Sequence, residues 1–433
     1  MRRKMIRLMS LFVCIALAVG CSDGVLLQDS LNKDGDKNEN VDEGENGGEE
    51  QPNPEVTAPQ AALALPNSYM LLPGESLDLP IVKAFAVWTE KSDAFGKVNL
   101  TGKLKARLVW ADPEGLIEET ALKVVGTDIN SAYIQVQTQA GVEGNAVVAI
   151  EVGGVVRWSW HLWVSKYDPA DTNATTLGAT SVSGGVVYRY NNGTGDYVLM
   201  DRNLGALSTD PKNGTNKKTW GMFYQWGRKD PFAGTSFKNV IPENPPVNNL
   251  AEATENPDVF LVASGNGDWY SYRNKQDHDL WGAESRKKSI YDPCPDGWMV
   301  PLFNRKLGPG DFGYINQNEY GFNGSPWNGL QHYVEGPNAF SWISGEYPGI
   351  TSPAVGYYPA AGYLTLNGGE HWWGPDEIRK WGYYWVAEAW TTTNPHDAGM
   401  MLFLNSSKFE LYAHNSWKRA EGLQLRCVRE NKE

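Results

Sequence analysis

Short runs in which apolar and polar residues alternate constrain the fold of this chain more than any other feature. They fill residues 61–169 and are separated by turn signals such as Pro73-Gly74 and Gly153-Gly154. A period of two places every second side chain on the same face of a β-strand. Several such runs at regular spacing predict an N-terminal β-sandwich over this part of the chain.

The last of these runs, residues 156–164, holds three tryptophans. Alternation places Trp158 and Trp160 on one face among aliphatic neighbours, and Trp163 on the other face among polar ones. We interpret Trp158 and Trp160 as core residues rather than as an aromatic platform for a sugar. Trp163 lies on the face that should meet water, just before the unit ends, so we expect it to pack against the next domain.

The N-terminal residues predict the compartment. Four basic residues precede the apolar run Leu11–Val19, which is too short to anchor a chain across a bilayer and is followed by Gly20 and Cys21. The pattern looks like a bacterial lipoprotein signal over residues 1–20, with lipid on the sulfur of Cys21. A plain secretory signal with an incidental cysteine is the alternative. We expect a chain held to the outer membrane by acyl chains, at the cell surface.

Residues 21–60 are acidic, rich in glycine, asparagine and proline, and poor in apolar residues. Such a segment buries too little surface to offset its ordering entropy, so we predict a disordered tether rather than an array of calcium ligands. The formal net charge of the chain is -13, and removal of the four basic signal residues leaves -17. We expect no nucleic-acid partner, because phosphate binding needs clustered lysine and arginine.

The cysteine count predicts one disulfide. Cys14 leaves with the signal and Cys21 carries lipid, so Cys294 and Cys427 remain as a pair in an oxidising compartment. A metal site built from these two thiols and distant histidines is the alternative. No CxxC or HxxxH spacing occurs in the sequence, and we predict neither a metal nor another cofactor.

The remaining chain is expected to form a linker over residues 170–177 and a larger domain over residues 178–433. This domain is dense in glycine, tryptophan, tyrosine and asparagine and has few clear helical windows. Residues 234–292 and 303–353 show no convincing periodicity, so we predict long loops there. Long loops on a small β-scaffold usually carry recognition.

Five motifs of the second domain occur in the order found in one known family. They are VLMDRNLGA (198–206), GMFYQWGRKDPF (221–232), YDPCPDGWMVP (291–301), GYYWVAE (382–388) and GLQLRCVRE (422–430). Together they resemble the domain named for the major paralogous proteins of Fibrobacter succinogenes, which is common in surface lipoproteins of Bacteroidetes. The first unit resembles the β-sandwich that often precedes this domain in cell-adhesion and fimbrial-tip-like proteins.

The resemblance implies the fold class: mainly β, with a β-sandwich followed by an α+β, C-type-lectin-like domain that has long loops. The charged motif residues Asp201-Arg202-Asn203 and residues 225–230 could bind a ligand. We interpret them instead as groups that satisfy loop carbonyls and pair with one another, because buried polar groups need partners.

We expect no enzyme activity. The sequence has no GxSxG nucleophile motif, no phosphate-binding glycine loop and no histidine spacing for a metal; its best local cluster is Asp277-His278-Asp279. Carboxylate pairs for glycoside hydrolysis depend on spatial distance and stay open. The calcium motif of C-type lectins is incomplete, since Trp327-Asn328-Gly329 lacks the acid.

Aromatic residues in the loops are the candidate ligand contacts. Trp372 and Trp373, between two glycines, are the preferred pair, followed by Trp327 and Trp269. We expect an adhesin or ligand-binding module, similar to those at fimbrial tips, whose partners are a glycan, a host or bacterial surface protein, or fimbrial subunits. In this hypothesis the first domain is a spacer or a site where a neighbour adds a strand. The alternative function is glycan capture in a polysaccharide-uptake system.

Overall fold

The structure is a computed structural model. It describes residues 60–91, 95–169, 187–191, 196–210, 216–233, 250–261, 267–270, 277–302, 341–343, 349–352, 356–365, 381–390, 397–405 and 409–430. All of these belong to one compact unit, residues 53–433. The signal, Cys21, the tether and the linker at 170–177 lie outside the described residues.

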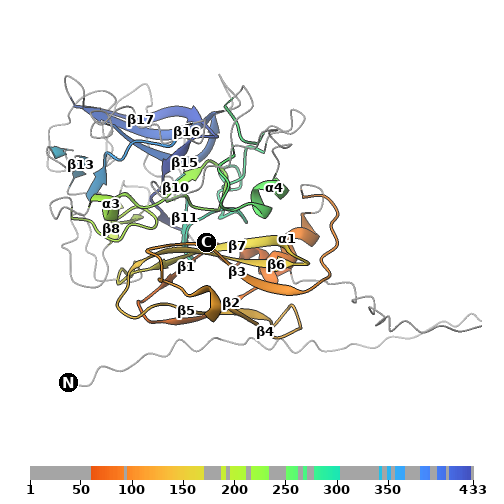
Figure 1. Ribbon diagram of the computed structural model, residues 1–433. Coiled ribbons are helices and arrows are strands. Elements are labelled where there is room, and N and C mark those ends of the chain that lie inside the picture. Colours follow the sequence, from red (N-terminus) through yellow and green to blue (C-terminus); the bar gives the residue numbers. More distant parts are fainter. Residues whose placement is uncertain are drawn as a thin grey trace, which may run out of the picture. The chain divides into compact units, whose positions relative to one another are not determined.

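The residues before Ser165 form two open sheets, which Figure 1 shows as two layers. The larger sheet has the order β1 (Ser68–Leu71), β7 (Val155–Val164), β6 (Gly144–Val152) and β3 (Leu104–Asp112). The smaller sheet has the order β2 (Ser76–Pro80), β5 (Tyr133–Gln137) and β4 (Lys123–Val125). Every pair is antiparallel except β1 with β7. The alternating runs therefore formed strands, as their period predicted.

A helix interrupts the first of these runs. Residues that the alternation assigned to a strand form α1 (Val82–Glu90), with the short 3-10 helices η1 (Gln60–Ala64) and η2 (Glu119–Ala121) elsewhere in this part. Residues 82–88 of α1 are all buried, including Lys83. A helix that is covered on all sides carries no amphipathic period, which explains why the sequence pattern misassigned it.

Strand β7 is covered on both faces. Every residue of it except Val155 is buried, and Trp158, Trp160 and Trp163 are each at most 1% exposed. The core role predicted for the first two rings is confirmed, whereas the prediction of a water-facing side is wrong. Trp163 packs against Tyr167, with 5.4 Å between ring centroids. The hydroxyl of Tyr167 accepts a bond from the N–H of Asp201, so later residues close this face.

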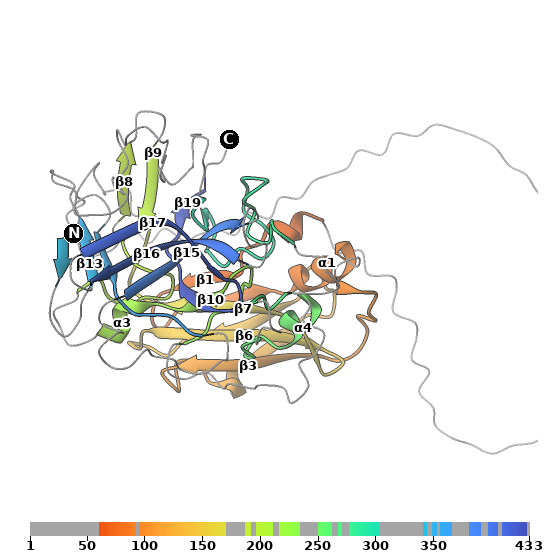
Figure 2. The same cartoon turned by 90° about the horizontal axis from the view of Figure 1, so that it is seen from above.

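The described residues after 187 form three further open sheets. The first is β10 (Phe223–Gln225), β18 (Gly422–Gln424), β15 (Trp381–Trp390), β16 (Asp397–Asn405) and β17 (Phe409–Lys418). The second is β11 (Trp298–Met299), β19 (Val428–Arg429), β9 (Asp196–Met200) and β8 (Val187–Asn191). The third is β12 (Ser341–Ile343), β13 (Gly349–Ser352) and β14 (Gly356–Pro359). Figure 2 shows β15, β16 and β17 running side by side.

Short helices and one disulfide complete this part. The helices are α3 (Asn216–Trp220) and α4 (Leu250–Glu255), and α4 lies in a stretch that we predicted to be loop. Cys294 and Cys427 are joined, with 6.0 Å between their Cα atoms, as the cysteine count predicted. The fold is mainly β. Among the described residues, no helix has the length and apolar content needed to cross a membrane.

Candidate ligand-binding site

The charged residues of the motifs are used to hold the protein together. The Nζ of Lys229 donates to the carboxylate of Asp230 at 2.6 Å and to the hydroxyl and carbonyl of Ser159 on β7. Both charged side chains are at most 4% exposed, and the ammonium also lies 4.5 Å from the ring centroid of Trp158. Burial lowers the pKa of Lys229, and the adjacent carboxylate opposes that shift. These buried contacts therefore join β7 to the motif at residues 221–232.

Arg228 and Asn203, two further polar residues of the motifs, also bond within the protein. Arg228 donates to the side chain of Gln225 and to three backbone carbonyls, those of residues 253, 256 and 259. Asn203 receives bonds from Arg426 and donates to the carbonyl of Trp220. The structural interpretation of these residues is confirmed.

The best histidine cluster of the sequence has the same kind of role. A ring nitrogen of His278 lies 2.8 Å from the guanidinium of Arg419, and the carbonyl of Asp277 accepts from the same side chain. Asp279 accepts the N–H of Glu284. Each of these three residues thus makes contacts within the protein.

Only one of the predicted ligand contacts can be placed. Trp269 is 0% exposed, and its indole N–H donates to the carbonyl of Trp226 at 2.7 Å. The expectation that it stacks on a ligand is therefore wrong, because the ring is sealed in the core. Trp327, Trp372 and Trp373 lie outside the described residues.

A cluster of four aromatic rings is the best site among the described residues. We call the rings of Tyr363, Trp381, Tyr383 and Trp417 the aromatic cluster. The two tyrosines are buried, and the two tryptophans are partly exposed. Ring centroids are 4.7 Å apart for Tyr363 and Tyr383, 5.4 Å for Tyr383 and Trp417, and 6.0 Å for Trp381 and Tyr383. The buried rings hold the exposed ones in fixed positions.

Strand periodicity explains how the cluster forms. Trp381 and Tyr383 are two positions apart on β15, so they share one face, and their rings are nearly parallel at 12°. Trp417 comes from β17, and Tyr363 follows the bridge between Gly362 and Gly382. None of these four rings was predicted as a ligand contact, because only aromatic residues in loop-like sequence were considered as candidates. The i, i+2 spacing in β15 was the available signal.

The cluster has the chemistry of a stacking surface. An indole ring offers a large apolar face with a negative π-system, and it loses little rotamer entropy when a ligand binds. The C–H face of a pyranose complements such a surface. The indole N–H of Trp417 is buried and has no hydrogen-bond acceptor among the described residues. The geometry thus suits contact with a flat or ring-shaped ligand.

A buried carboxyl group lies near the end of β17. Glu421 is 6% exposed, and burial raises its pKa to about 8, with a further contribution from the charge of Asp397. Asp397 itself accepts from the Nζ of Lys418 at 2.7 Å. Among the residues that the structure describes, no group of three or more metal-ligating side chains converges here or elsewhere.

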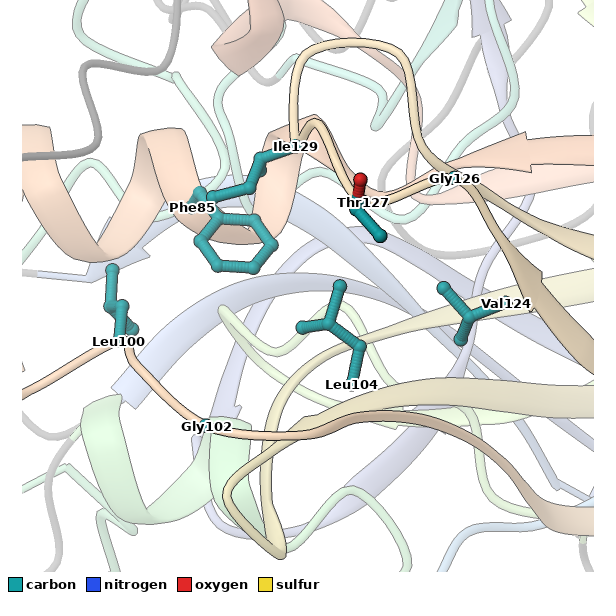
Figure 3. A pocket seen from close by; sticks show the side chains of 8 residues that line it. All are labelled: Phe85, Leu100, Gly102, Leu104, Val124, Gly126, Thr127 and Ile129. Atoms are coloured by element: carbon teal, nitrogen blue, oxygen red, sulfur yellow. The ribbon is translucent and has the colours of Figure 1, made fainter. Parts of the chain in front are cut away.

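The first part of the chain contains a pocket of about 350 Å³. Figure 3 shows Phe85 of α1, Leu104 of β3 and Val124 of β4 pointing toward it. The lining residues are Phe85, Leu100, Gly102, Leu104, Val124, Gly126, Thr127 and Ile129. Thr127 supplies the only side-chain hydroxyl, and none of the lining residues is charged. It lies between β3 and β4, which are edge strands of their sheets.

Comparison of the chain with protein-family models, with curated proteins and with solved structures finds no match in any of the three.

Proposed function

We propose that this chain is a lipid-anchored surface protein that binds its ligand through the aromatic cluster, and that it acts as an adhesin or ligand-binding module of the kind found at fimbrial tips. The observation that carries the proposal is the pair of partly exposed tryptophans, Trp381 and Trp417, held by two buried tyrosines. Polar groups of the described motif residues are occupied by structural bonds, which favours binding over catalysis.

The architecture that goes with this function has two domains. A β-sandwich over residues 61–169 precedes a C-type-lectin-like domain over residues 178–433, and the tether joins them to lipid on Cys21 in the outer membrane. The pairing of β9 and β19 supports the second assignment, because these strands come from near the start and the end of that domain. The edges of β3 and β4 are where a fimbrial neighbour would add a strand.

Binding of glycans by purified protein tests the proposal. The lipid-free chain is applied to an array of host glycoproteins, bacterial surface glycans and plant polysaccharides, together with Trp381→Ala and Trp417→Ala. Each variant is expected to lose at least about tenfold in affinity, which corresponds to roughly 1.4 kcal/mol of lost stacking. Trp110→Ala is the matched control, because Trp110 is a partly exposed tryptophan on β3. Equal binding by all four proteins would refute the aromatic cluster as the site.

The same array distinguishes an adhesin from the alternative function, glycan capture. Glycan capture for polysaccharide uptake predicts saturable binding to soluble dietary polysaccharides, whereas an adhesin binds immobilised host or bacterial surface ligands. Lipid anchoring is tested separately by labelling cells with a fatty-acid analogue. Cys21→Ser is expected to abolish the label and to release the protein from membranes.

A further inference from the structure

Strand β1 is held on one side by a parallel ladder. Ser68 is aligned with His161 on β7, and Leu71 with Val164. The N–H of His161 donates to the carbonyl of Asn67 at 2.9 Å, just before β1 begins. At the other end, the N–H of Ser165 donates to the carbonyl of Leu71 at 2.8 Å. The whole length of the strand is thus bonded to the last strand of the same sheet.

The other side of β1 is bonded to the segment 290–295, far away in sequence. The amide of Asn67 donates to the carbonyls of Ile290 and Asp292, at 2.8 and 2.9 Å. The hydroxyl of Ser68 donates to the carbonyl of Pro293, and Ser68 forms a parallel bridge with Pro295. Asn67 and Ser68 are both 1% exposed, so water does not compete for these bonds. We call this set of contacts the β1 junction.

The disulfide brings the C-terminal strands to the same point. Cys294 lies within the segment that contacts β1, and it is bonded to Cys427. The N–H of Glu430 donates to the carbonyl of Gly297 at 2.8 Å. Trp417 of the aromatic cluster stands ten positions before Cys427. A short covalent path therefore leads from the aromatic cluster through the disulfide to the β1 junction.

We propose that the β1 junction bears mechanical load. Tension between the residues that precede Gln60 and a ligand held at the aromatic cluster passes through β1, the segment 290–295 and the disulfide. The inference rests on the proposed function, because a tethered protein with a bound surface ligand is under tension whenever the two surfaces separate.

The direction of the strands makes the junction resistant. Because β1 and β7 are parallel, tension that pulls the start of β1 away from the residues after Val164 acts along both strands in opposite directions. All bonds of the ladder are then loaded together. A strand pulled sideways from a sheet edge loses its bonds one at a time, and the highest load on any one bond comes much earlier.

Single-molecule force spectroscopy on the chain from Ser22 onward, without lipid, tests the proposal. One measurement pulls between handles at the N-terminus and the C-terminus. The other pulls between the C-terminus and Lys123→Cys, an exposed position on the edge strand β4. At equal force, unfolding through the N-terminal handle is expected to be slower by about tenfold or more, since several hydrogen bonds must break together. Equal or faster unfolding through the N-terminal handle would overturn the proposal.

Variants of the junction separate a load-bearing role from a merely structural one. Ser68→Ala and Asn67→Ala are expected to speed unfolding about tenfold when force enters at the N-terminus, and to have little effect when it enters at Lys123; one tenfold step corresponds to 1.4 kcal/mol. Ser76→Ala on β2 is the matched control, because its hydroxyl makes an exposed contact with Gln137 on β5. Equal acceleration in both directions would show a stability effect only and would refute the load path.

The length released on unfolding reports on the disulfide. Cys294 and Cys427 are separated by 133 positions, so reduction should add about 440–480 Å of extensible chain, at 3.3–3.6 Å per residue. No such gain would show that the bridge is not formed in the protein under tension, which would remove the disulfide from the proposed load path. Because the handles are covalent, a failed glycan array leaves these outcomes unchanged, and a failed junction leaves the glycan result unchanged.

Discussion

Two tryptophan-rich strands of the same protein use their rings in opposite ways. In β7, Trp158, Trp160 and Trp163 are sealed between a second sheet and later residues of the chain. In β15, Trp385 is equally buried, but Trp381 at the start of the strand stays partly exposed. Composition is similar in the two strands. What differs is whether another layer of the protein covers the ring, and that depends on contacts distant in sequence.

The largest effect on stability is expected from loss of the disulfide between Cys294 and Cys427, which lies in the same part of the chain as β15. Cys294→Ser with Cys427→Ser should lower the free energy of unfolding by about 4–5 kcal/mol, because the closed loop is long. Chemical denaturation of both proteins measures the difference. A change below about 2 kcal/mol would mean that the open chain retains enough structure to offset the lost constraint.

Removal of the charge of Lys229, which contacts β7, should destabilise the protein almost as much. Lys229→Met leaves the buried carboxylate of Asp230 without its cation and is expected to cost about 3–5 kcal/mol. The double variant Lys229→Met with Asp230→Leu should recover most of that loss, since no unpaired charge remains. Urea unfolding of the unmodified protein, the single variant and the double variant measures these differences in stability. Full stability of the single variant would mean that the pair is not buried in solution.

Matched tryptophan substitutions test the comparison directly. Trp160→Ala should cost about 3–5 kcal/mol because it opens a cavity in a filled core. Trp381→Ala should cost about 1–2 kcal/mol, because part of that ring already contacts water. Thermal unfolding measures both values. If Trp381→Ala proved as costly as Trp160→Ala, the ring would be a core residue and a poor candidate for ligand contact.

The two regions should also respond to pH with opposite signs. Burial lowers the pKa of His161 beside β1 to about 3, so its contribution to stability is complete above 6.5 and is lost as the pH falls. Burial raises the pKa of Glu421 to about 8, so its contribution is complete below 4.5 and is lost as the pH rises toward 8.

Denaturation measured between pH 4 and pH 9 separates the contributions of His161 and Glu421 to stability. Glu421→Gln should remove the loss of stability on the alkaline side and leave the acid side unchanged. His161→Gln should do the reverse. A Glu421→Gln profile that coincides with that of the unmodified protein would show that this carboxyl group is hydrated in solution.

The smallest effect on stability is expected from a partly exposed ion pair. Arg107 of β3 lies 3.6 Å from Asp258, and both side chains are about one-third exposed. Water and salt screen such a pair, so Asp258→Asn should change stability by less than about 1 kcal/mol. A larger loss, measured at 0.15 M salt, would show that this contact is as important as the buried ones.

The sequence predicted what depends on local pattern and on simple counting. Alternation located the strands of the first sheets, and the two cysteines left after residue 21 predicted the disulfide. It misassigned α1, because a helix buried all round shows no helical period. It placed Trp269 at a surface, because loop-like sequence says nothing about which chain packs over it. It missed Trp381 and Trp417, whose neighbours come together only when β15 and β17 lie in one sheet.

The partners of β1 also decide when the protein can finish folding. Ser68 meets His161, 93 positions later, and Asn67 meets Asp292, 225 positions later. A chain synthesised from its N-terminus presents this strand long before either partner has left the ribosome. Non-local pairing of this kind is slow, and a waiting strand edge invites pairing with the wrong chain. The β1 junction should therefore be among the last contacts to form, and residues 68–71 should need shielding until residues 161–164 and 290–295 have been synthesised.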